Sequence, residues 1–181
     1  MAITSTTRQV IEQAIRDCLG IIGVLIDNCR FGIYNCGSVR EVAKAGESYK
    51  PTQNIDVHGA GVYVFFNEST IYYVGEADDV ARRLLGEHCA VHIGGSEGVV
   101  RFLMHYLDSI CNQKAKWEKL SAEDREKFVK GILKDRIGRL SIYIVTCKEL
   151  KDKKENGKRR KNKLRENLEK CLISRLKPIL Q

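Results

Sequence analysis

One stretch, from Gly61 to His88, constrains the fold more than any other part of the chain. Val, Tyr and Phe side chains alternate over residues 62–66, a polar break follows, and the pattern resumes over residues 71–74. Period-two alternation of β-branched and aromatic residues around a polar turn predicts a β-hairpin. Gly75 ends the second strand, and the helix-forming residues 77–85 follow it directly. The stretch therefore predicts two paired strands that run straight into a helix.

The pairing of these two strands decides which side chains share a face of the hairpin. We predict the register that places Tyr63 opposite Tyr73, which puts both phenols on one face. Tyrosine can donate or accept a proton, and the following helix adds the guanidinium groups of Arg82 and Arg83. In this register the other face of the hairpin carries Val62, Val64, Phe66, Tyr72 and Val74.

The size and composition of the chain fit one domain with a substantial core. It has 181 residues, 43% of them hydrophobic, which suits a single domain or a single domain with an elaborated insertion. The net charge is +8, and residues 148–163 carry nine Lys or Arg against three Asp or Glu. This uneven distribution indicates a polyanionic partner, nucleic acid before membrane, although a solvated basic loop has the same composition.

The cysteines and the hydropathy predict an intracellular, cytoplasmic protein without a membrane partner. There are seven cysteines, at irregular spacings and with no CxxC pair, which is not the pattern of a secreted disulfide framework. The longest apolar run, residues 18–26, is too short to span a bilayer. It also lacks the small-residue cleavage site of a signal peptide, so it is interpreted as the buried face of a helix.

The remaining pattern predicts helices at both ends of the chain and a third strand. Thr6 and Gln9 form a capping box ahead of an apolar helical pattern that continues to Ile26. Residues 140–146 alternate as a strand. We therefore expect an α/β (α+β) fold in which helices flank a small three-stranded sheet, antiparallel or mixed.

The last predicted helix runs from about Arg159 to Leu176, and one of its side chains is out of place. On a helical wheel, Glu169 lies at the rim of the apolar arc, where a carboxylate without a partner is costly to desolvate. A salt bridge to an arginine would explain it, and so would a role as a metal ligand. The apolar arc consists of Leu164, Leu168, Cys171, Leu172 and Leu176.

Taken together, these motifs resemble the GIY-YIG nuclease signature. Gly61-Val62-Tyr63 and Tyr73-Val74-Gly75 are similar to its first two motifs, and Arg83 follows at a fitting distance. The segment Glu169-Lys170-Cys171-Leu172-Ile173, with a proline five residues later, is similar to its terminal motif. The resemblance implies a nuclease domain over 61–181 with an insertion at about 89–138. Residues 1–60 would then form an N-terminal helical extension packed on this core.

Two positions depart from the family pattern. Members commonly have His or Tyr four residues after the arginine, but Glu87 stands there and His88 is five residues after Arg83. Either the helix accommodates an extra residue, or His88 is not the equivalent group. Members also place Asn three residues after the terminal proline, where this chain has Gln181.

The resemblance implies metal-dependent hydrolysis of DNA phosphodiester bonds, with Mg²⁺ or Mn²⁺ held by Glu169. Arg83 would clamp a phosphate oxygen, with Arg82 as the alternative clamp. Tyr63 would act as the general base for the attacking water and His88 would take up the proton. Tyr73 would orient the water or the phosphate.

The partner expected from this resemblance is DNA, with double-stranded DNA favoured. A compact member is most similar to restriction or defence enzymes. A structure-selective repair nuclease, a non-catalytic nucleic-acid-binding module on the same scaffold and a basic RNA-binding protein remain alternatives, and a homodimer remains open. The basic side chains expected to contact nucleic acid, besides Arg82, are Lys158, Arg159, Arg160, Lys161 and Lys163.

Two alternatives concern residues 88–98. Ser96 is a candidate N-cap for the helix predicted over 99–110, and the same helix start could hold a phosphate on its free backbone N–H groups. The spacing His88-Cys89-x-x-His92 offers zinc ligands, but a complete site would need one more side chain from elsewhere.

Overall fold

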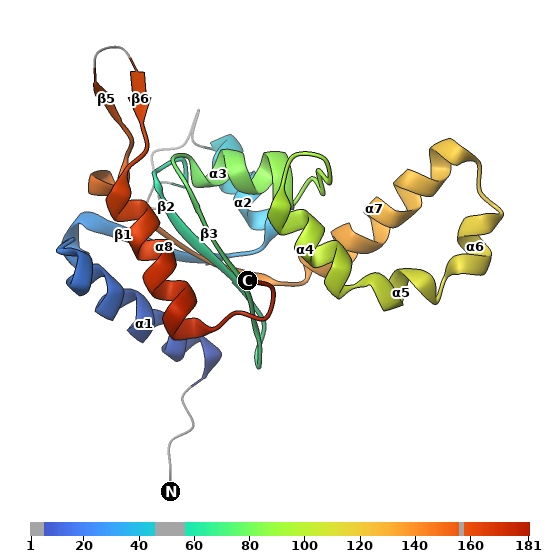
Figure 1. Ribbon diagram of the computed structural model, residues 1–181, viewed down its shortest axis with the longest axis horizontal. Helices are drawn as coiled ribbons and strands as arrows, with labels where there is room; N and C mark the ends of the chain where they lie inside the picture. Colours follow the sequence, from blue (N-terminus) through green and yellow to red (C-terminus); the bar gives the residue numbers. More distant parts are fainter. Residues whose placement is uncertain (1–5, 46–56, 156–157) are drawn as a thin grey trace, which may run out of the picture.

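The structure, a computed structural model, describes residues 6–45, 57–155 and 158–181. Its centre is an antiparallel sheet with the strand order β1-β4-β2-β3 (Figure 1). The α/β class predicted from the sequence is confirmed, but the sheet has four strands where three were predicted. The strands are β1 (Cys29–Tyr34), β2 (Gly61–Phe66), β3 (Ile71–Ala77) and β4 (Ser141–Cys147).

Strand β1 was missed because its sequence, CRFGIY, does not alternate cleanly. It lies at the edge of the sheet and pairs with β4 alone among the described strands, so its burial is uneven and its pattern is weak. Because β1 belongs to the segment 1–60, that segment contributes a strand to the central sheet in addition to the helices Thr7–Ile22 and Cys36–Ala45.

Helices cover both faces of the sheet. Helices α1 and α8 lie side by side on one face, and α2, α3, α4 and α7 cover the other (Figure 1). The helices α4 to α7 also form an arm that extends away from the sheet (Figure 1). Their bounds are α1 (Thr7–Ile22), α2 (Cys36–Ala45), α3 (Val80–Arg83), α4 (Glu97–His105), α5 (Leu107–Cys111), α6 (Lys114–Glu118), α7 (Ala122–Gly138) and α8 (Lys163–Leu176), with 3-10 turns at Ile26–Asn28 and Lys148–Leu150.

Each face of the sheet has its own hydrophobic core. On the face covered by α1 and α8, Val62, Val64 and Val74 are buried against residues such as Ile15 and Leu172. The opposite face carries Tyr63 and Phe65 together with residues of α3, α4 and α7. The two tyrosines of the hairpin therefore lie on the face away from the main contacts of α8. Glu169 is carried by α8, which packs on the edge strand β3.

The predicted register of the hairpin was wrong by two residues, although the two phenols do share a face. Tyr63 pairs with Gly75, and Tyr73 pairs with Phe65. A β-bulge at the start of β3 adds one residue to that strand and shifts the pairing. Because a difference of two residues in register keeps each side chain on its own face, Tyr73 stays on the side of Tyr63. The same bulge moves Tyr72 into the core on that side, so its predicted place beside Val62 was also wrong.

The ends of the terminal helices differ from the sequence prediction. The capping box of Thr6 and Gln9 is confirmed, with the Thr6 N–H donating to the Gln9 side chain at 2.8 Å. Helix α1 ends at Ile22 rather than continuing to Ile26, because Gly23 takes a left-handed φ of 73° and terminates it. Helix α8 begins at Lys163, since Asn162 is its N-cap.

The basic segment before α8 forms a separate hairpin that projects from the sheet (Figure 1). Its strands are β5 (Lys153–Glu155) and β6 (Lys158–Arg160). The turn predicted at Asn156-Gly157 lies outside the described residues. No helix in the described part of the chain is both long enough and apolar enough to cross a bilayer.

The prediction that the cysteines form no disulfide framework was wrong. Six of the seven are paired, as Cys18–Cys171, Cys29–Cys147 and Cys36–Cys89. Each pair joins the segment 1–60 to the rest of the chain, over sequence separations that give no local signal. The prediction of a cytoplasmic location therefore loses the support it took from the cysteines.

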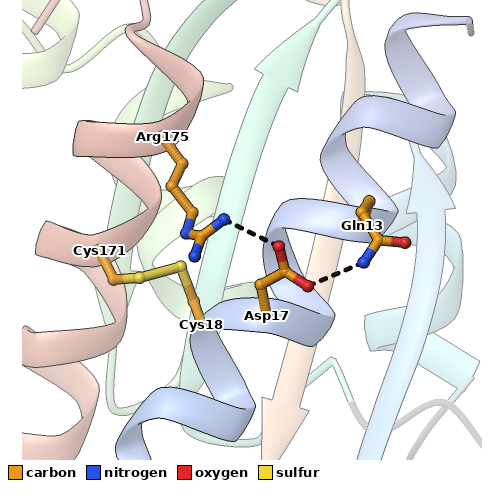
Figure 2. The surroundings of a disulfide bond; sticks show 5 residues. All are labelled: Gln13, Asp17, Cys18, Cys171 and Arg175. Atoms are coloured by element: carbon orange, nitrogen blue, oxygen red, sulfur yellow. Dashed lines mark hydrogen bonds and ion pairs between the residues drawn. A yellow bond between two sulfur atoms is a disulfide. The ribbon is translucent and has the colours of Figure 1, made fainter.

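Figure 2 shows the first of these links. Cys18 of α1 is bonded to Cys171 of α8, and beside it Arg175 forms an ion pair with Asp17 at 2.8 Å. Gln13 donates a hydrogen bond to the same aspartate at 2.8 Å. Covalent and polar contacts thus fasten the N-terminal helix to the helix that carries Glu169.

Candidate active site

The buried ring of Tyr63 crosses the neighbouring strand at a glycine. A Cβ atom added to Gly75 would lie 2.5 Å from the Tyr63 hydroxyl oxygen and 2.5 Å from its ring, so only glycine leaves this path open. Gly61 is restricted in another way, because a Cβ there would lie 1.8 Å from the Val145 carbonyl oxygen. Gly75 therefore lets the Tyr63 hydroxyl cross β3 toward the sheet edge, and Gly61 lets β2 lie close to the backbone of β4.

His88 is the hydrogen-bonding partner of that hydroxyl. The Tyr63 hydroxyl and His88 Nε2 are 2.9 Å apart, and both side chains are buried. Burial and the nearby Arg83 guanidinium lower the pKa of His88 to about 3, so its imidazole is neutral at physiological pH. Burial raises the pKa of Tyr63 well above its ordinary value. The pair is therefore a phenol hydrogen-bonded to a neutral imidazole.

The extra residue between Arg83 and His88 is absorbed by a π-helical turn. Helix α3 passes directly into a π-helix at Leu84–His88, in which the Cys89 N–H donates to the Leu84 carbonyl at 2.8 Å. In a π-helix, residues five apart lie on the same side of the helix, as residues four apart do in an α-helix. The spacing of five residues therefore brings His88 to the same side of the helix as Arg83. The sequence alone had left open whether His88 is the equivalent of the family's His or Tyr.

Tyr73 lies beside this pair. Its ring centroid is 5.5 Å from that of His88 and 6.4 Å from that of Tyr63. Burial, followed by the Glu169 carboxylate, raises the pKa of Tyr73 to about 12. Gly98 of α4 makes room for both neighbours, because a Cβ there would lie 2.5 Å from the His88 ring and 3.0 Å from the Tyr73 ring.

Arg83 lies next to the same phenols. It lowers the pKa of Tyr63 through charge and hydrogen bonding, against the larger effect of burial. One guanidinium nitrogen forms an ion pair with Glu87 one turn along, and Nε is buried with no hydrogen-bonding partner among the described residues. Arg82, on the neighbouring position of α3, is exposed.

Glu169 is brought to this group from the far end of the chain. Its negative charge raises the pKa values of both Tyr63 and Tyr73, which places its carboxylate within electrostatic range of both phenols. The salt bridge considered as an alternative role is not formed, because no described residue makes a hydrogen bond or ion pair with this carboxylate. Burial, followed by the neighbouring Glu76 carboxylate, raises the pKa of Glu169 to about 7.

A buried arginine organises the acidic side chains next to Glu169. Arg165, one turn earlier on α8 and only 2% exposed, forms ion pairs with Glu76, Asp78 and Asp152. Although burial alone would raise it, hydrogen bonds from Lys161 and Arg165 lower the pKa of Glu76 below its ordinary value. This network was not predicted from the sequence. The available signal was a charged residue at 165 on the apolar side of the last helix.

These side chains border an open cleft with a volume of about 510 Å³. One wall comes from α3 and the π-helical turn, including Arg82, Arg83 and Glu87. The other wall comes from β3 and the start of α8, including Glu76 and Arg165. The cleft therefore has charges of both signs. Of the predicted catalytic residues Arg83 lines it, whereas Tyr63, Tyr73, His88 and Glu169 are not among its lining residues.

The predicted nucleic-acid-binding residues have different surroundings. Lys158, Arg159 and Arg160 lie in strand β6, and Arg160 and Lys163 are exposed. Lys161 lines the cleft but forms ion pairs with Glu76 at 2.8 Å and with Glu166 at 3.1 Å. Lys161 is therefore a counterion within the fold, and its predicted role in nucleic-acid binding stays a prediction, since its side chain is 53% exposed.

Gln181 uses its amide to bind the edge of the sheet. Its side-chain oxygen accepts from the Val74 N–H, and its side-chain nitrogen donates to the Val74 carbonyl, both at 2.9 Å. The backbones of Ile179 and Leu180 also donate to β3, at Ile71 and Tyr72. The C-terminal residues thus satisfy the free backbone groups of the edge strand that carries Tyr73.

The donors present fit a magnesium or manganese ion better than zinc. Mg²⁺ is commonly held by one or two carboxylates and keeps several waters, and Glu169 is a half-buried carboxylate without a partner among the described residues. The described residues contain no group of three His, Cys, Asp or Glu side chains arranged around one point. The zinc alternative fails because Cys89 is in a disulfide and His88 bonds Tyr63.

Ser96 is the N-cap residue of α4, as predicted, but its side chain makes no capping hydrogen bond. Its hydroxyl is buried without a partner among the described residues. The structure thus confirms Ser96 as the N-cap position but not its capping hydrogen bond, and the helix predicted over 99–110 is divided at Tyr106 into α4 and α5.

The raised pKa of Glu169 predicts how its replacement alters stability in metal-free buffer. Because the folded-state pKa is about 7 and the ordinary value is 4.5, folded protein retains a proton in this range that the unfolded chain has released. Ionisation of Glu169 therefore costs stability as the pH rises through this window. We expect Glu169→Gln to melt at a higher temperature than the wild type at pH 8, with the difference vanishing near pH 4.5. Scanning calorimetry in EDTA measures both values, and equal melting temperatures at pH 8 would contradict the assignment.

Comparison of the chain with models of known protein families, with curated proteins and with solved structures found no match.

Proposed function

We propose that this chain is a metal-dependent endonuclease that hydrolyses phosphodiester bonds in DNA. The observation that carries the proposal is that four kinds of group lie within electrostatic range of the two phenols at the edge of the sheet. These groups are a buried phenol–imidazole pair, a second phenol, a guanidinium and a carboxylate without a partner among the described residues. They come from elements up to about a hundred residues apart in the sequence. They are Tyr63 with His88, Tyr73, Arg83 and Glu169.

Each group has a role that follows from its chemistry. Glu169 would hold the divalent cation, which supplies charge stabilisation for the phosphate and the leaving 3′ oxygen. Arg83 is positioned to neutralise a non-bridging phosphate oxygen. Attack by water forms a P–O bond and breaks the bond to the 3′ oxygen. Tyr63 accepts the proton from that water as its own hydroxyl proton passes to Nε2 of His88, 2.9 Å away.

The DNA is proposed to lie along the cleft next to the phenol cluster. Arg82 is exposed on one wall of the cleft. The basic β5–β6 hairpin projects from the sheet (Figure 1). Cations that contact phosphates give salt-dependent, sequence-independent affinity. The basic composition of residues 148–163, with nine Lys or Arg and three Asp or Glu, suits such contacts. The carboxylates in the same cleft are compensated by Lys161 and Arg165.

The alternative functions differ from a duplex-cutting nuclease in their substrate, or in that they bind nucleic acid without cleaving it. A panel of duplex DNA, branched or flapped DNA and RNA, each incubated with Mg²⁺, separates them by the products formed. Cutting of plain duplex supports a restriction or defence nuclease, and cutting of branched DNA alone supports a structure-selective repair nuclease. Binding without cleavage of any DNA would refute the proposal in favour of a non-catalytic binding module, and cleavage confined to RNA would refute DNA as the substrate.

The phenol–imidazole pair provides a test of the proposed proton path. Tyr63→Phe and His88→Gln are each expected to lower kcat by about 10²- to 10⁴-fold, because each interrupts proton transfer from water. The double variant is expected to lose no more than the worse single variant, because groups that act as a unit are not additive. Single-turnover cleavage of duplex DNA measures these rates.

The matched control for these variants is Tyr34→Phe. The Tyr34 hydroxyl is also buried, but it has no hydrogen-bonding partner among the described residues. Its removal should leave the cleavage rate unchanged. Losses that multiply in the Tyr63→Phe/His88→Gln double variant would show that the two residues act independently.

A further inference from the structure

The His88 ring is held by a hydrogen bond at one of its nitrogens. Nε2 faces the Tyr63 hydroxyl at 2.9 Å, whereas Nδ1 is buried with no partner among the described residues. A catalytic or metal-binding histidine is normally oriented by a second hydrogen bond at its other nitrogen. For His88, orientation must come from ring packing and from the position of its own backbone.

That backbone is irregular and strained. His88 ends a π-helical turn, and residues 89–96 form turns with no helix or strand. Val91, three residues later, is buried and has a φ of 55°, in the left-handed region that a β-branched residue rarely adopts. Such a conformation persists only where the surrounding structure imposes it. The turn that carries His88 therefore needs an external restraint.

The disulfide between Cys36 and Cys89 supplies that restraint. Cys89 directly follows His88 and is 7% exposed. Cys36 is the first residue of α2, and the residue before it, Asn35, exchanges hydrogen bonds with Ser38 at 2.8 and 2.9 Å. The preceding residue, Tyr34, ends strand β1. The disulfide thus ties the His88 turn to a capped helix that leads directly from the central sheet.

From this arrangement we propose that the Cys36–Cys89 disulfide is the positioning element of His88, so that DNA cleavage requires the oxidised chain. The inference rests on the proposed function. Reduction by a dithiol transfers two electrons and two protons to the disulfide, which leaves two thiols and an oxidised, cyclised reductant. The turn then loses its link to the sheet, and His88 loses its register with Tyr63.

The other disulfides allow a comparison between positioning and general stabilisation. Cys29–Cys147 links β1 to β4 within the sheet and spans 118 residues, whereas Cys36–Cys89 spans 53. In the chain-entropy account, a longer closed loop gives the larger stabilisation. A purely structural role for both therefore predicts that loss of Cys29–Cys147 is at least as damaging. A positioning role for Cys36–Cys89 predicts the opposite order for kcat.

The test compares two double variants, Cys36→Ala/Cys89→Ala and Cys29→Ala/Cys147→Ala, below the melting temperature of both. Loss of the first pair is expected to lower kcat by about 100-fold with little change in KM, because a displacement near 1 Å at a catalytic group costs about that much. Loss of the second pair is expected to leave kcat within a few-fold of the wild type. Equal losses, or a larger loss in the second variant, would overturn the proposal.

Nitrogen NMR of the imidazole rings tests the same claim without turnover. The chain has four histidines. The imidazole signal that disappears in the His88→Gln variant is that of His88. We expect the His88 signals to shift or broaden when Cys36–Cys89 is removed and to stay unchanged when Cys29–Cys147 is removed. An unchanged His88 spectrum in the first variant overturns the positioning role. Failure of the oxidised wild type to cut any DNA counts instead against the proposed function.

Discussion

Replacement of Glu169 with glutamine is expected to lower the rate of DNA cleavage by about 10³-fold or more. The carboxylate is the proposed ligand of the divalent cation, and charge stabilisation by a metal ion is worth several kcal/mol, with each 1.36 kcal/mol equal to a factor of ten. DNA binding in EDTA should be retained, because the basic side chains are unchanged. Cleavage kinetics with Mg²⁺, together with binding measured in EDTA, distinguish loss of chemistry from loss of affinity.

The control for this variant is Glu126→Gln, which makes the same chemical change at an exposed position of α7. The Glu126 side chain is 68% exposed and its ion pair is with Lys130. Its replacement should leave cleavage unchanged. Wild-type rates for Glu169→Gln would remove the metal-ligand role, whereas equal losses in both variants would show that the effect is not specific to the site.

Replacement of Arg165 with methionine is expected to destabilise the protein by about 3–5 kcal/mol, because it leaves buried carboxylates without their counterion. The Arg165 side chain is 3% exposed, and its partners Glu76, Asp78 and Asp152 are between 9% and 18% exposed. The loss should appear as a lower midpoint of denaturant unfolding. It should also displace the start of α8, and with it Glu169.

Arg175→Met is the matched control, because it removes an ion pair of the same helix at the surface. Arg175 is 43% exposed and its partner Asp17 is 35% exposed (Figure 2). Exposed pairs contribute about 0–1 kcal/mol, so the two arginines should differ severalfold in effect. A loss below about 1 kcal/mol for Arg165→Met would contradict a structural role for the buried network.

The sequence predicted those parts of the fold that have local patterns. Alternation in residues 61–74 gave the hairpin, and the capping box at Thr6 gave the start of the first helix. Edge strand β1 was not predicted, because buried and exposed side chains do not alternate along it. The register of the hairpin was also predicted wrongly, because it depends on the length of the turn and on a bulge, and neither has a recognisable residue pattern.

The residues of the candidate site were predicted one by one from the sequence. The backbone geometry, disulfides and ion pairs that hold them were not. Spacing alone left His88 ambiguous, since the π-helical turn that resolves a spacing of five is a property of backbone hydrogen bonding. The disulfide partners are at least 53 residues apart, and connectivity cannot be deduced from the sequence. The role of Arg165 depends on three carboxylates from other elements, including Glu76.

The most direct test of the nuclease assignment is the conversion of supercoiled plasmid by the oxidised protein after removal of metal. The account predicts no cleavage in EDTA, nicked or linear products once Mg²⁺ is added in excess, and no recovery for Glu169→Gln. Plasmid that stays supercoiled at every Mg²⁺ and Mn²⁺ concentration, or cleavage that persists in EDTA, would contradict it.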